Sequence, residues 1–538
     1  SHVMLYGLQR LAEARRVGWI LLVEGESDCW TAWYYGLPAL GVPGKACWRT
    51  EWRELLASLD VYVWQEPDAA DFTRRVGRDL PAAKVIVAPE GTKDLSDAHV
   101  AGEDVPTLLA RLKDTATSAT DVLRADLDAE LRKLEAAAAP VAQADPLAVL
   151  EDELWRLGYG GDLTPPLVTY LCLTTRLLAM RPGAMPAHLL LVGPPSAGKS
   201  YTLQTVLRLF PPEAYHIIDA GSPRVLIYDY TDLSHRAVIF GEADSLPAGE
   251  DNPAASAVRN LLQDHRLRYA VTIRDATTGQ YSVHEIDRPG PTVLVTTSVR
   301  ELGGQLGSRV FVLAVPEDAD KIRSALHTQA MLEIEGAAAP NEALVALQAS
   351  LQRRAPWDVA VPYVRELAAL LGKSINAARI LRDFQRLLAL IKAVAILRER
   401  HRKRQADGRL VATVDDYAAV YRLVRPMYEA SVTGATEQVR ALVEAVRMLR
   451  AEGVERVTYT AISRKLQMHP EQVKRLARMA ARRDWVINRA ERPYQAANLD
   501  VGEPLPASVG LPAPEDLADA ADADLRSHSA TADALGPS

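Results

Sequence analysis

One stretch, "HLLLVGPPSAGKS" (188–200), limits what this chain can fold into more than any other. An apolar run leads directly into G-x-x-x-x-G-K-S, the pattern of a strand, a phosphate-binding loop and a helix. The glycines let the loop backbone point its N–H groups at phosphate oxygens, and the helix N-terminus that follows favours an anion. The stretch therefore predicts a nucleoside triphosphate site at the edge of an α/β sheet.

The residues of this loop divide the binding of ATP and Mg²⁺ between them. Lys199 brings a positive charge to the β- and γ-phosphates, and the Ser200 hydroxyl is a ligand for Mg²⁺. A chance glycine turn is the alternative, but the helical pattern over 201–210 favours the nucleotide site. The predicted ATP-binding residues of the loop are Gly193, Pro194, Pro195, Ser196, Ala197, Gly198, Lys199 and Ser200.

A catalytic acid is expected at the end of a neighbouring strand. The stretch "RAVIFGEADS" (236–245) is an apolar strand that ends in Glu242 and Asp244, with Gly241 where an Asp is usual. Glu242 is therefore the predicted catalytic base that orients and deprotonates the attacking water. The second contact to the magnesium ion falls either to Asp244 or to a water.

Two later segments carry the remaining groups expected around the γ-phosphate. The stretch "PTVLVTTS" (291–298) is a buried strand, and its last hydroxyls, Thr297 and Ser298, are placed to sense that phosphate. After a short loop comes "LGSRVFVL" (306–313), which places Arg309 where an arginine finger would sit in a ring of subunits.

A β-hairpin is predicted just before the sensor strand, in "RLRYAVTIRDATTGQYSVHEID" (266–287), with its polar turn at 277–279. These motifs in this order resemble AAA+ ATPases. The hairpin makes the chain similar to the helicase-associated branch, which includes the minichromosome maintenance (MCM) helicases. The resemblance covers about 187–430, with an ATPase core over 187–335 and a helical lid over 336–433.

The resemblance implies roles for three arginines. Arg309 would complete the ATP site of a neighbouring subunit, Arg382 would act as a second sensor, and Arg274 in the hairpin would grip a DNA backbone. Self-assembly into a ring, expected to be a hexamer, is part of the same implication. Simpler alternatives stay open: a surface arginine, a structural salt bridge and a solvated hairpin residue, respectively.

The N-terminal part of the chain has its own constraint in "LLVEGESD" (21–28), where an apolar run ends in three carboxylates. Short apolar runs alternate with helical patterns over 15–110, which predicts a small α/β sheet. Glu26 and Asp28 fall at the start of the next helix, where acids suit the positive end of the helix dipole. Glu24 falls at the end of the strand.

With "VYVWQEPDAADF" and "GTKDLSDAHVAG", this region (4–111) resembles the Toprim domain of DnaG-type primases, topoisomerases and some nucleases. The resemblance implies that Glu24, Glu66 and Asp68 gather divalent metal for phosphoryl transfer, with Glu66 standing where the family has Asp. Lys93 and Asp94 belong to the last motif. The alternative is a Toprim fold kept as a structural or DNA-docking unit, and activity in priming is not expected.

The C-terminal module (434–502) is predicted to contain helices at 437–449, 459–468 and 469–484, followed by a strand at 485–488. This spacing resembles a winged helix-turn-helix, whose third helix enters a DNA groove. Its alternative role is in protein contacts. The predicted DNA-facing residues are Gln472, Lys474, Arg475 and Arg478.

The charge of the chain is unevenly distributed. Residues 437–499 hold thirteen Arg and Lys against seven Asp and Glu, whereas residues 500–538 hold eight acids against Arg526 alone. The basic module suggests an anionic partner. The stretch 503–538, rich in Pro, Ala and Asp, is predicted to be a disordered acidic tail.

The remaining segments complete an α/β multidomain fold class. Residues 112–144 are predicted to be a helical linker, and 145–186 a helical N-terminal part of the motor with helices starting at Asp145-Pro146 and Thr164-Pro165. Three cysteines without paired spacing, and no signal peptide or membrane span, predict a cytoplasmic protein without disulfides or zinc. The opening Ser1–Val3 resembles a tag remnant.

Together these features predict an ATP-dependent DNA helicase that acts in replication of a phage or mobile element. Its cofactors would be ATP and Mg²⁺, and its partners single-stranded or forked DNA, further copies of the chain and other replication proteins. Two alternatives stay open: an ATP-controlled assembly switch or helicase loader without unwinding, and a Toprim nuclease coupled to an ATPase.

Overall fold

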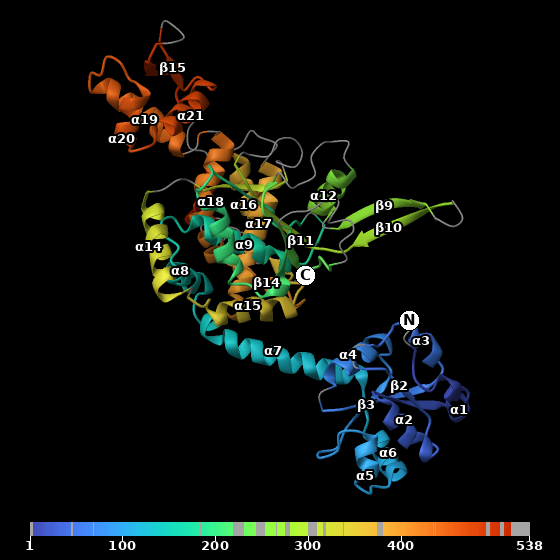
Figure 1. Cartoon of the computed structure of the whole chain (residues 1–538). Helices are drawn as coiled ribbons and strands as arrows, with labels where there is room; N and C mark the ends of the chain where they lie inside the picture. The colour runs from blue at the N-terminus through green and yellow to red at the C-terminus, as the bar shows by residue number, and fades with distance from the viewer. Residues whose placement is uncertain are drawn as a thin grey trace, which may run out of the picture. The chain divides into compact units, whose positions relative to one another are not determined.

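The computed structural model forms two compact units, residues 1–133 and 134–538, and each contains a parallel sheet (Figure 1). Each unit is described by itself. The described residues are 4–44, 47–67, 69–182, 184–218, 231–243, 253–264, 266–274, 280–299, 309–315, 319–336, 338–373, 380–433, 435, 437–490, 495–505 and 510–517.

The N-terminal unit is built on a five-stranded sheet with the order β2-β1-β3-β4-β5. Its first four strands are parallel, and most of their apolar residues are buried because helices cover both faces, although Val87 at the end of one strand is exposed. The strands are β1 Trp19–Val23, β2 Ala39–Gly41, β3 Asp60–Gln65, β4 Lys84–Val87 and β5 Thr117–Ser118. The helices are α1 Leu11–Val17, α2 Glu26–Tyr34, α3 Trp52–Leu56, α4 Ala70–Asp79, α5 Leu95–Val100 and α6 Val105–Asp114.

The end of this unit lies later than the sequence predicts. The boundary expected at residue 111 is too early, because β5 pairs antiparallel with β4 and Ala119 is buried in the core of the unit. Helix α7 (Ala119–Gln143) then extends through the predicted linker. A two-residue polar strand in an alanine-rich segment leaves no pattern that sequence analysis can detect.

The large unit contains a second five-stranded sheet with the order β12-β6-β11-β8-β7, and its strands are all parallel. The strand that precedes the phosphate-loop motif, β6, therefore has β11 between itself and the Glu242 strand, β8. The strands are β6 Leu189–Val192, β7 Tyr215–Ile218, β8 Arg236–Phe240, β11 Thr292–Ser298 and β12 Phe311–Ala314.

The predicted hairpin is confirmed: β9 (Leu267–Arg274) pairs antiparallel with β10 (Tyr281–Arg288) as a separate two-stranded sheet. It extends from the body of the large unit next to α12 (Pro253–Asp264) (Figure 1). Its turn at 277–279 lies outside the described residues.

Helices that precede the sheet in the chain and helices that follow it share one hydrophobic core with it. Helix α9 (Thr164–Thr174) is buried along its whole length, because "TPPLVTYLCLT" is apolar on most sides. It contacts the sheet, the helix after the phosphate loop and two helices of the region predicted to be a lid. The segments 145–186 and 336–433 therefore pack as parts of one core, which the sequence divided in two.

The two helices with predicted starts, at Asp145-Pro146 and Thr164-Pro165, begin there. Asp145 caps the first of them, since its Oδ1 accepts a hydrogen bond of 3.3 Å from Leu147 N. The helices are α8 Pro146–Arg156, α10 Lys199–Leu207, α14 Ala319–Glu335, α15 Glu342–Arg353, α16 Val364–Lys373, α17 Ile380–Leu397 and α18 Val414–Thr433, with short strands β13 Val359–Ala360 and β14 Leu410–Val411.

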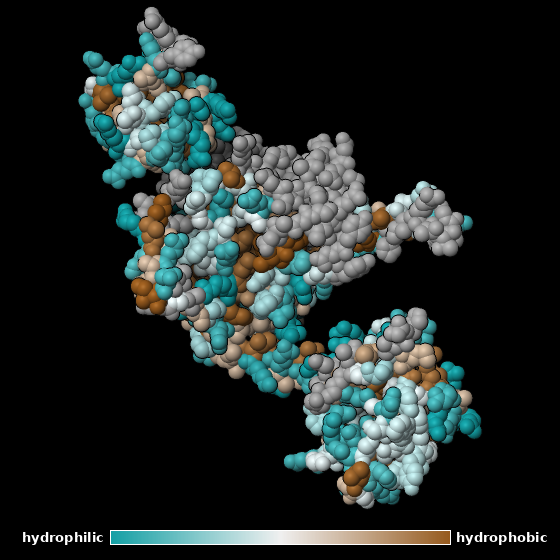
Figure 2. Space-filling view, viewed as in Figure 1, coloured by the Kyte–Doolittle hydropathy of each residue, from teal (hydrophilic) through white to brown (hydrophobic). Residues whose placement is uncertain are grey.

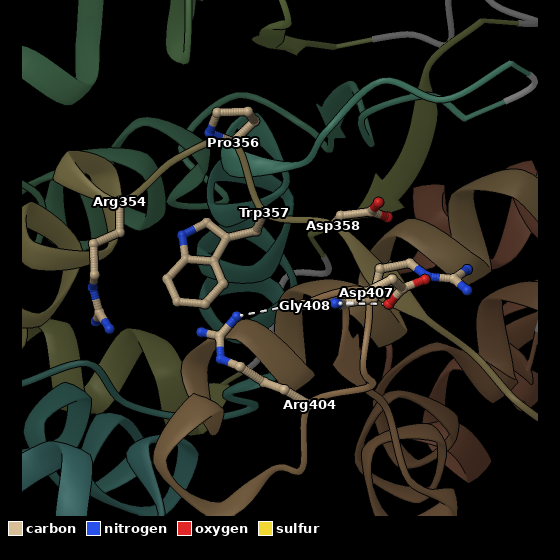
Figure 3. Close-up of a pocket in the computed structure, with 8 residues that line it drawn as sticks. Arg354, Pro356, Trp357, Asp358, Arg404, Asp407 and Gly408 are labelled. Carbon is tan, nitrogen blue, oxygen red and sulfur yellow. Dashed lines mark hydrogen bonds and ion pairs between the residues drawn. The ribbon is translucent and has the colours of Figure 1, made fainter.

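Arginines of the basic run at 398–404 form ion pairs with acids of these helices and the segments beside them. Arg398 bridges Asp145 and Asp416, so it joins α8 to α18. Beside it lies a pocket of ≈ 230 Å³ in which Arg354 and Arg404 pack on the Trp357 ring, at 5.0 and 5.2 Å from its centroid (Figure 3). Acids line the same pocket, and we assign it a structural role.

The C-terminal module has its own hydrophobic core. It consists of α19 (Glu437–Ala451), α20 (Tyr459–Leu466), α21 (Pro470–Ala481) and the antiparallel pair β15 (Val486–Asn488) and β16 (Leu499–Val501). The three helices and the first strand agree with the sequence prediction. The second strand was not predicted, because "LDV" has no strand pattern of its own.

Part of the predicted disordered tail is ordered, which corrects the prediction for 510–517. Leu511 and Leu517 are buried in the core of the large unit, and the Tyr417 hydroxyl donates a hydrogen bond of 2.6 Å to the carbonyl of Pro512. Two leucines spaced six apart in an acidic, proline-rich stretch are enough to dock it, although the composition is typical of disorder.

None of the described helices is both long and apolar enough to cross a membrane. The three cysteines are free.

Candidate functional site

The phosphate-loop motif has the backbone that its glycines predict. Gly198 has φ 85° and Ser196 has φ 65°, so two left-handed residues curl the loop before α10 begins. A Cβ at Gly193 would lie 2.4 Å from the carbonyl oxygen of Val315, so only glycine fits there. The Gly193 N–H donates a hydrogen bond of 3.2 Å to the carbonyl of Ser298, which ties the loop to β11.

Lys199 is buried in this loop, with 9% of its surface exposed. Its Nζ donates to the carbonyls of Gly193 at 2.9 Å and Pro194 at 2.8 Å. Burial lowers the pKa of Lys199, and the negative charge of Glu242 acts in the opposite direction. The ammonium group is therefore held over the loop by two backbone carbonyls.

The ends of β11 and β8 lie side by side next to this loop. The Thr297 hydroxyl donates a hydrogen bond of 2.6 Å to the carbonyl of Gly241, the residue before Glu242. Thr297 thus fixes the strand end that carries Glu242, whose side chain is exposed. This positioning contact was not predicted from the sequence, because Thr297 was expected to face the phosphate. Asp244 lies outside the described residues.

Arg309 lies at the opposite edge of the same sheet. It precedes β12 by two residues, and its Nη2 donates a hydrogen bond of 3.0 Å to Gln263 Oε1 in α12. Val315, which contacts the phosphate loop, is six residues further on, roughly 20 Å along an extended strand. Arg309 is therefore too far away to reach the phosphate loop of its own chain.

Two predicted arginines are placed only by their backbones. Arg274 is the last residue of β9, opposite Tyr281, and Arg382 lies in the first turn of α17. Their side chains lie outside the description of the structure.

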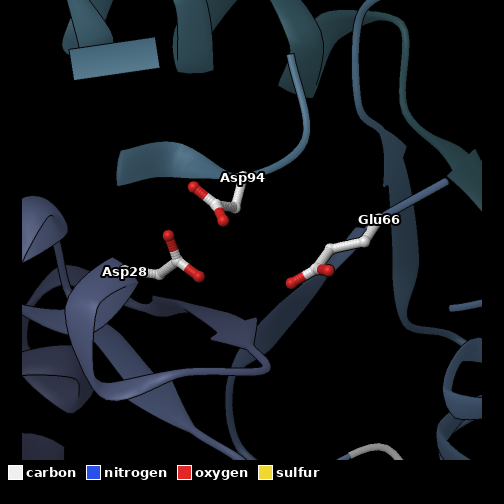
Figure 4. Close-up of side chains that lie close together, drawn as sticks. All are labelled: Asp28, Glu66 and Asp94. Carbon is white, nitrogen blue, oxygen red and sulfur yellow. The ribbon is translucent and has the colours of Figure 1, made fainter. Parts of the chain in front are cut away.

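Three carboxylates of the N-terminal unit come together at one edge of its sheet (Figure 4). Asp28 is in the first turn of α2, Glu66 directly follows β3, and Asp94 precedes α5. One carboxylate oxygen from each lies within 4.8 Å of the others. Carboxyl ends of parallel strands meet at one edge, so three distant segments converge.

Two of the three carboxylates are buried, and one of these, Asp28, has a raised pKa. Asp28 and Glu66 are 3% and 6% exposed. Burial raises the pKa of Asp28 to about 6, and the nearby charges of Asp94 and Glu66 add to the effect, although Ser96 hydrogen bonds oppose it. These bonds run to Asp28 Oδ1 from Ser96 N at 3.0 Å and from Ser96 Oγ at 3.1 Å.

The donor set fits a divalent cation. Oxygens around Mg²⁺ or Mn²⁺ lie about 3 to 4.5 Å apart when each is about 2.1–2.2 Å from the ion. The three carboxylate oxygens of this cluster lie within 4.8 Å of one another, which is close to that spacing. Lys93 Nζ, 3.7 Å from Glu66 Oε2, balances part of the negative charge from an exposed position.

The structure brings only one of the predicted metal ligands into this cluster. Glu66 is in the cluster, whereas Glu24 is not one of the three grouped carboxylates, and Asp68 lies outside the described residues. Asp28 does begin α2 as predicted, but its side chain turns into the cluster. Asp94 belongs to the motif "GTKDLSDAHVAG". The distances of Asp28 and Asp94 from the strands that precede them were not used to predict metal ligands.

Helix α21 exposes a basic face. Val473, Leu476, Ala477 and Ala480 face its core, which leaves Arg475 and Arg478 exposed and Gln472 and Lys474 partly exposed. Lys474 lies 3.6 Å from Glu471. Arg482 continues the exposed row by one turn, and sequence analysis did not single it out.

Comparison with known proteins gives a partial relationship. No family model matches the chain. A stretch of 94 residues is 36% identical to a protein named Gene 57 protein, of Mycobacterium phage D29. The stretch amounts to 17% of this chain and spans 60% of the phage protein. Part of the chain is therefore similar to a phage protein.

Proposed function

We propose that this chain is an ATP-dependent DNA helicase of a phage or mobile element. In this proposal an AAA+ motor similar to MCM helicases acts together with a Toprim-like N-terminal unit and a winged-helix module. The observation that carries it is the strand order β12-β6-β11-β8-β7, with Thr297 on the strand between the phosphate loop and Glu242. The partial similarity to a phage protein supports the proposed origin.

ATP would bind at residues 193–200. Lys199 would exchange its two carbonyl partners for the β- and γ-phosphates, and Ser200 would help to hold Mg²⁺. Glu242 would take the proton of the attacking water, at a strand end that Thr297 fixes. Mg²⁺ supplies charge neutralisation to the phosphates when bound.

Hydrolysis would need a second copy of the chain. Arg309 is roughly 20 Å from the loop of its own subunit along β12, so its guanidinium could stabilise the transferred phosphoryl group only in a neighbouring subunit. A head-to-tail ring places each Arg309 edge against the next ATP edge. Residues of the β9–β10 hairpin and the basic face of α21 would contact DNA phosphates, which gives salt-dependent affinity without sequence preference.

The decisive test compares the full chain with its Lys199→Ala variant on forked DNA. We expect DNA-stimulated ATP hydrolysis and strand separation from the parent, and a loss of at least about 100-fold in both from the variant. ATP-dependent assembly without strand separation by the parent would instead support the loader alternative. An absence of ATP hydrolysis in the parent would contradict the motor altogether.

A second candidate function, a Toprim nuclease coupled to the ATPase, rests on the cluster of Asp28, Glu66 and Asp94, in which the first two are buried. These residues would hold a divalent cation, and that cation supplies charge stabilisation for phosphodiester cleavage. We expect any Mn²⁺-dependent DNA cleavage to be lost in Asp28→Asn. Cleavage that survives in Asp28→Asn but is lost in Glu24→Ala would favour the ligands first predicted from the sequence.

A further inference from the structure

His188 is a buried histidine directly before β6, at the end of that strand away from the phosphate loop. Its Nδ1 accepts a hydrogen bond of 3.1 Å from Leu294 N in β11, so this nitrogen carries no proton. The other ring nitrogen, Nε2, therefore carries the proton and donates it to the carbonyl of Leu262 at 3.1 Å. The neutral ring is thus held in one tautomer between a strand of the sheet and helix α12.

The bond from His188 caps the C-terminal end of α12. The last four carbonyls of an α-helix have no partner within the helix, and Leu262 lies in the last turn of α12, which ends at Asp264. Leu262 is buried, and a buried carbonyl that lacks a partner is costly. The strand that leads to the phosphate loop therefore supplies a hydrogen-bond donor that the end of α12 needs.

The β9–β10 hairpin starts from this end of α12. Strand β9 begins at Leu267, three residues after α12 ends, and Leu267 is buried in the same small core as Leu261 and Leu262 of the helix. Val271 and Ile286 of the hairpin pack against that core, and Figure 2 shows hydrophobic side chains where the hairpin leaves the unit. The position of the hairpin base is therefore set by the end of α12, which lies beside it (Figure 1).

We propose that His188 is a positioning residue that fixes the base of the hairpin on the sheet that carries the phosphate loop, so that DNA at the hairpin raises the rate of ATP hydrolysis. This inference rests on the proposed function, in which the hairpin contacts DNA. The four residues of β6 connect His188 to Gly193, where the phosphate loop begins. Phe311 N donates a hydrogen bond of 2.7 Å to the carbonyl of His188, which holds the start of β6 in the sheet. Because His188 ties α12 to this strand, a force on the hairpin from DNA is transmitted to the sheet.

The test separates the two bonds of the His188 ring with two substitutions. In His188→Asn the amide lies where Nδ1 was and can still accept from Leu294 N, but it is too short to reach the carbonyl of Leu262. In His188→Gln the amide lies where Nε2 was and can still donate to that carbonyl. ATP hydrolysis by the full chain is measured with and without a single-stranded oligonucleotide, and the ratio of the two rates is the DNA stimulation. We expect His188→Asn to keep its rate without DNA within about 2-fold of the parent and to lose at least about 5-fold in DNA stimulation, whereas His188→Gln keeps the stimulation.

The control for a general loss of stability is His235→Ala. His235 precedes β8 as His188 precedes β6, and its Nδ1 lies 2.8 Å from the carbonyl of Arg176 instead of bonding to α12. We expect this variant to unfold at a lower temperature than the parent and to keep the DNA stimulation of the parent.

Unchanged DNA stimulation in His188→Asn would overturn the role of His188 and leave the proposed helicase intact. An equal fall of both rates in that variant, or a loss of stimulation in His235→Ala, would also overturn it, because each indicates a structural role alone. A parent whose ATP hydrolysis does not respond to DNA would contradict the proposed function, and this inference with it. If His188→Asn does not fold, His188→Gln decides: stimulation within about 2-fold of the parent supports the inference, and its loss overturns it.

Discussion

The two sheets present opposite chemistry at the same kind of edge. In the large unit, the carboxyl end of β6 leads into a loop with two left-handed residues and the buried Lys199. In the N-terminal unit, the corresponding edge holds three clustered carboxylates, of which Asp28 and Glu66 are buried and Asp28 has a raised pKa. A parallel sheet thus brings distant residues together at one edge, and the side chains there decide whether the ligand is an anion or a cation.

The two sites also differ in how their charges are stabilised without a ligand. Lys199 has carbonyl partners within its own loop, so its charge is accommodated before any phosphate arrives. Asp28 accepts two hydrogen bonds from Ser96, but its burial and the two neighbouring carboxylates still raise its pKa to about 6. Without a ligand the carboxylate cluster is therefore the less stable of the two sites, and a bound cation would offset the repulsion between its negative charges.

The largest expected effect is in Asp28→Asn, which keeps an oxygen that can accept both Ser96 bonds. In EDTA at pH 7 we expect this variant to stabilise the N-terminal unit by up to about 3 kcal/mol, because it removes a charge with a pKa raised by about two units. With Mn²⁺ we expect the order to reverse, since the parent alone binds the ion well. Calorimetric unfolding of the full chain measures both changes.

The control for this change is Glu26→Gln, in which an exposed carboxylate on the same helix loses its charge. We expect it to shift unfolding little in either buffer. If Asp28→Asn were neutral or destabilising in EDTA, repulsion within the cluster would be refuted. ATP hydrolysis by Asp28→Asn should remain near the parent rate, because the two sites use separate sheets.

The stability difference between the parent and Asp28→Asn should also depend on pH. The folded state binds the Asp28 proton more tightly than the unfolded chain, so the parent gains stability as pH falls from about 6 toward the ordinary pKa of 3.8. Above pH 6 the full cost of the ionised carboxylate is present. The advantage of the variant in EDTA should therefore shrink between pH 7 and pH 4, and a constant advantage would contradict the assignment.

A smaller effect is expected from Lys93→Met. Lys93 is the exposed lysine beside the carboxylate cluster, in contrast to the buried Lys199 of the phosphate loop. Lys93 is exposed and lies 3.7 Å from Glu66, so its removal makes the cluster more negative by a screened charge. We expect Mn²⁺ affinity to rise about 2- to 5-fold by isothermal titration calorimetry, with Lys84→Met as the exposed control. A fall in affinity would mean that Lys93 helps to shape the site.

The sequence predicts the two sites unequally well because they are built differently. The phosphate loop is contiguous over 193–200, so its residues, its strand and its helix can all be identified from one motif. The carboxylate cluster is assembled from positions 28, 66 and 94. The resemblance to Toprim domains favoured Glu24 and Asp68 as ligands. Whether Asp28 turns into the cluster depends on the packing of α2 against α5, which no local pattern records.

Tertiary packing also explains the other corrections. The strand β5 and the segment 510–517 are polar or acidic by composition, yet each docks through one or two buried residues, such as Ala119 and Leu517. The division of helices into an N-terminal part and a lid fails for the same reason, because α9 is apolar enough to join both. Periodicity identifies elements, whereas it says little about which elements share a core.

The central claim is that copies of this chain surround DNA and hydrolyse ATP at their contacts. Electron microscopy of the full chain with a non-hydrolysable ATP analogue and forked DNA tests it most directly. The account predicts closed rings with DNA in the channel, with the Arg309 edge of each subunit beside the phosphate loop of the next. Monomers on DNA under these conditions would contradict it.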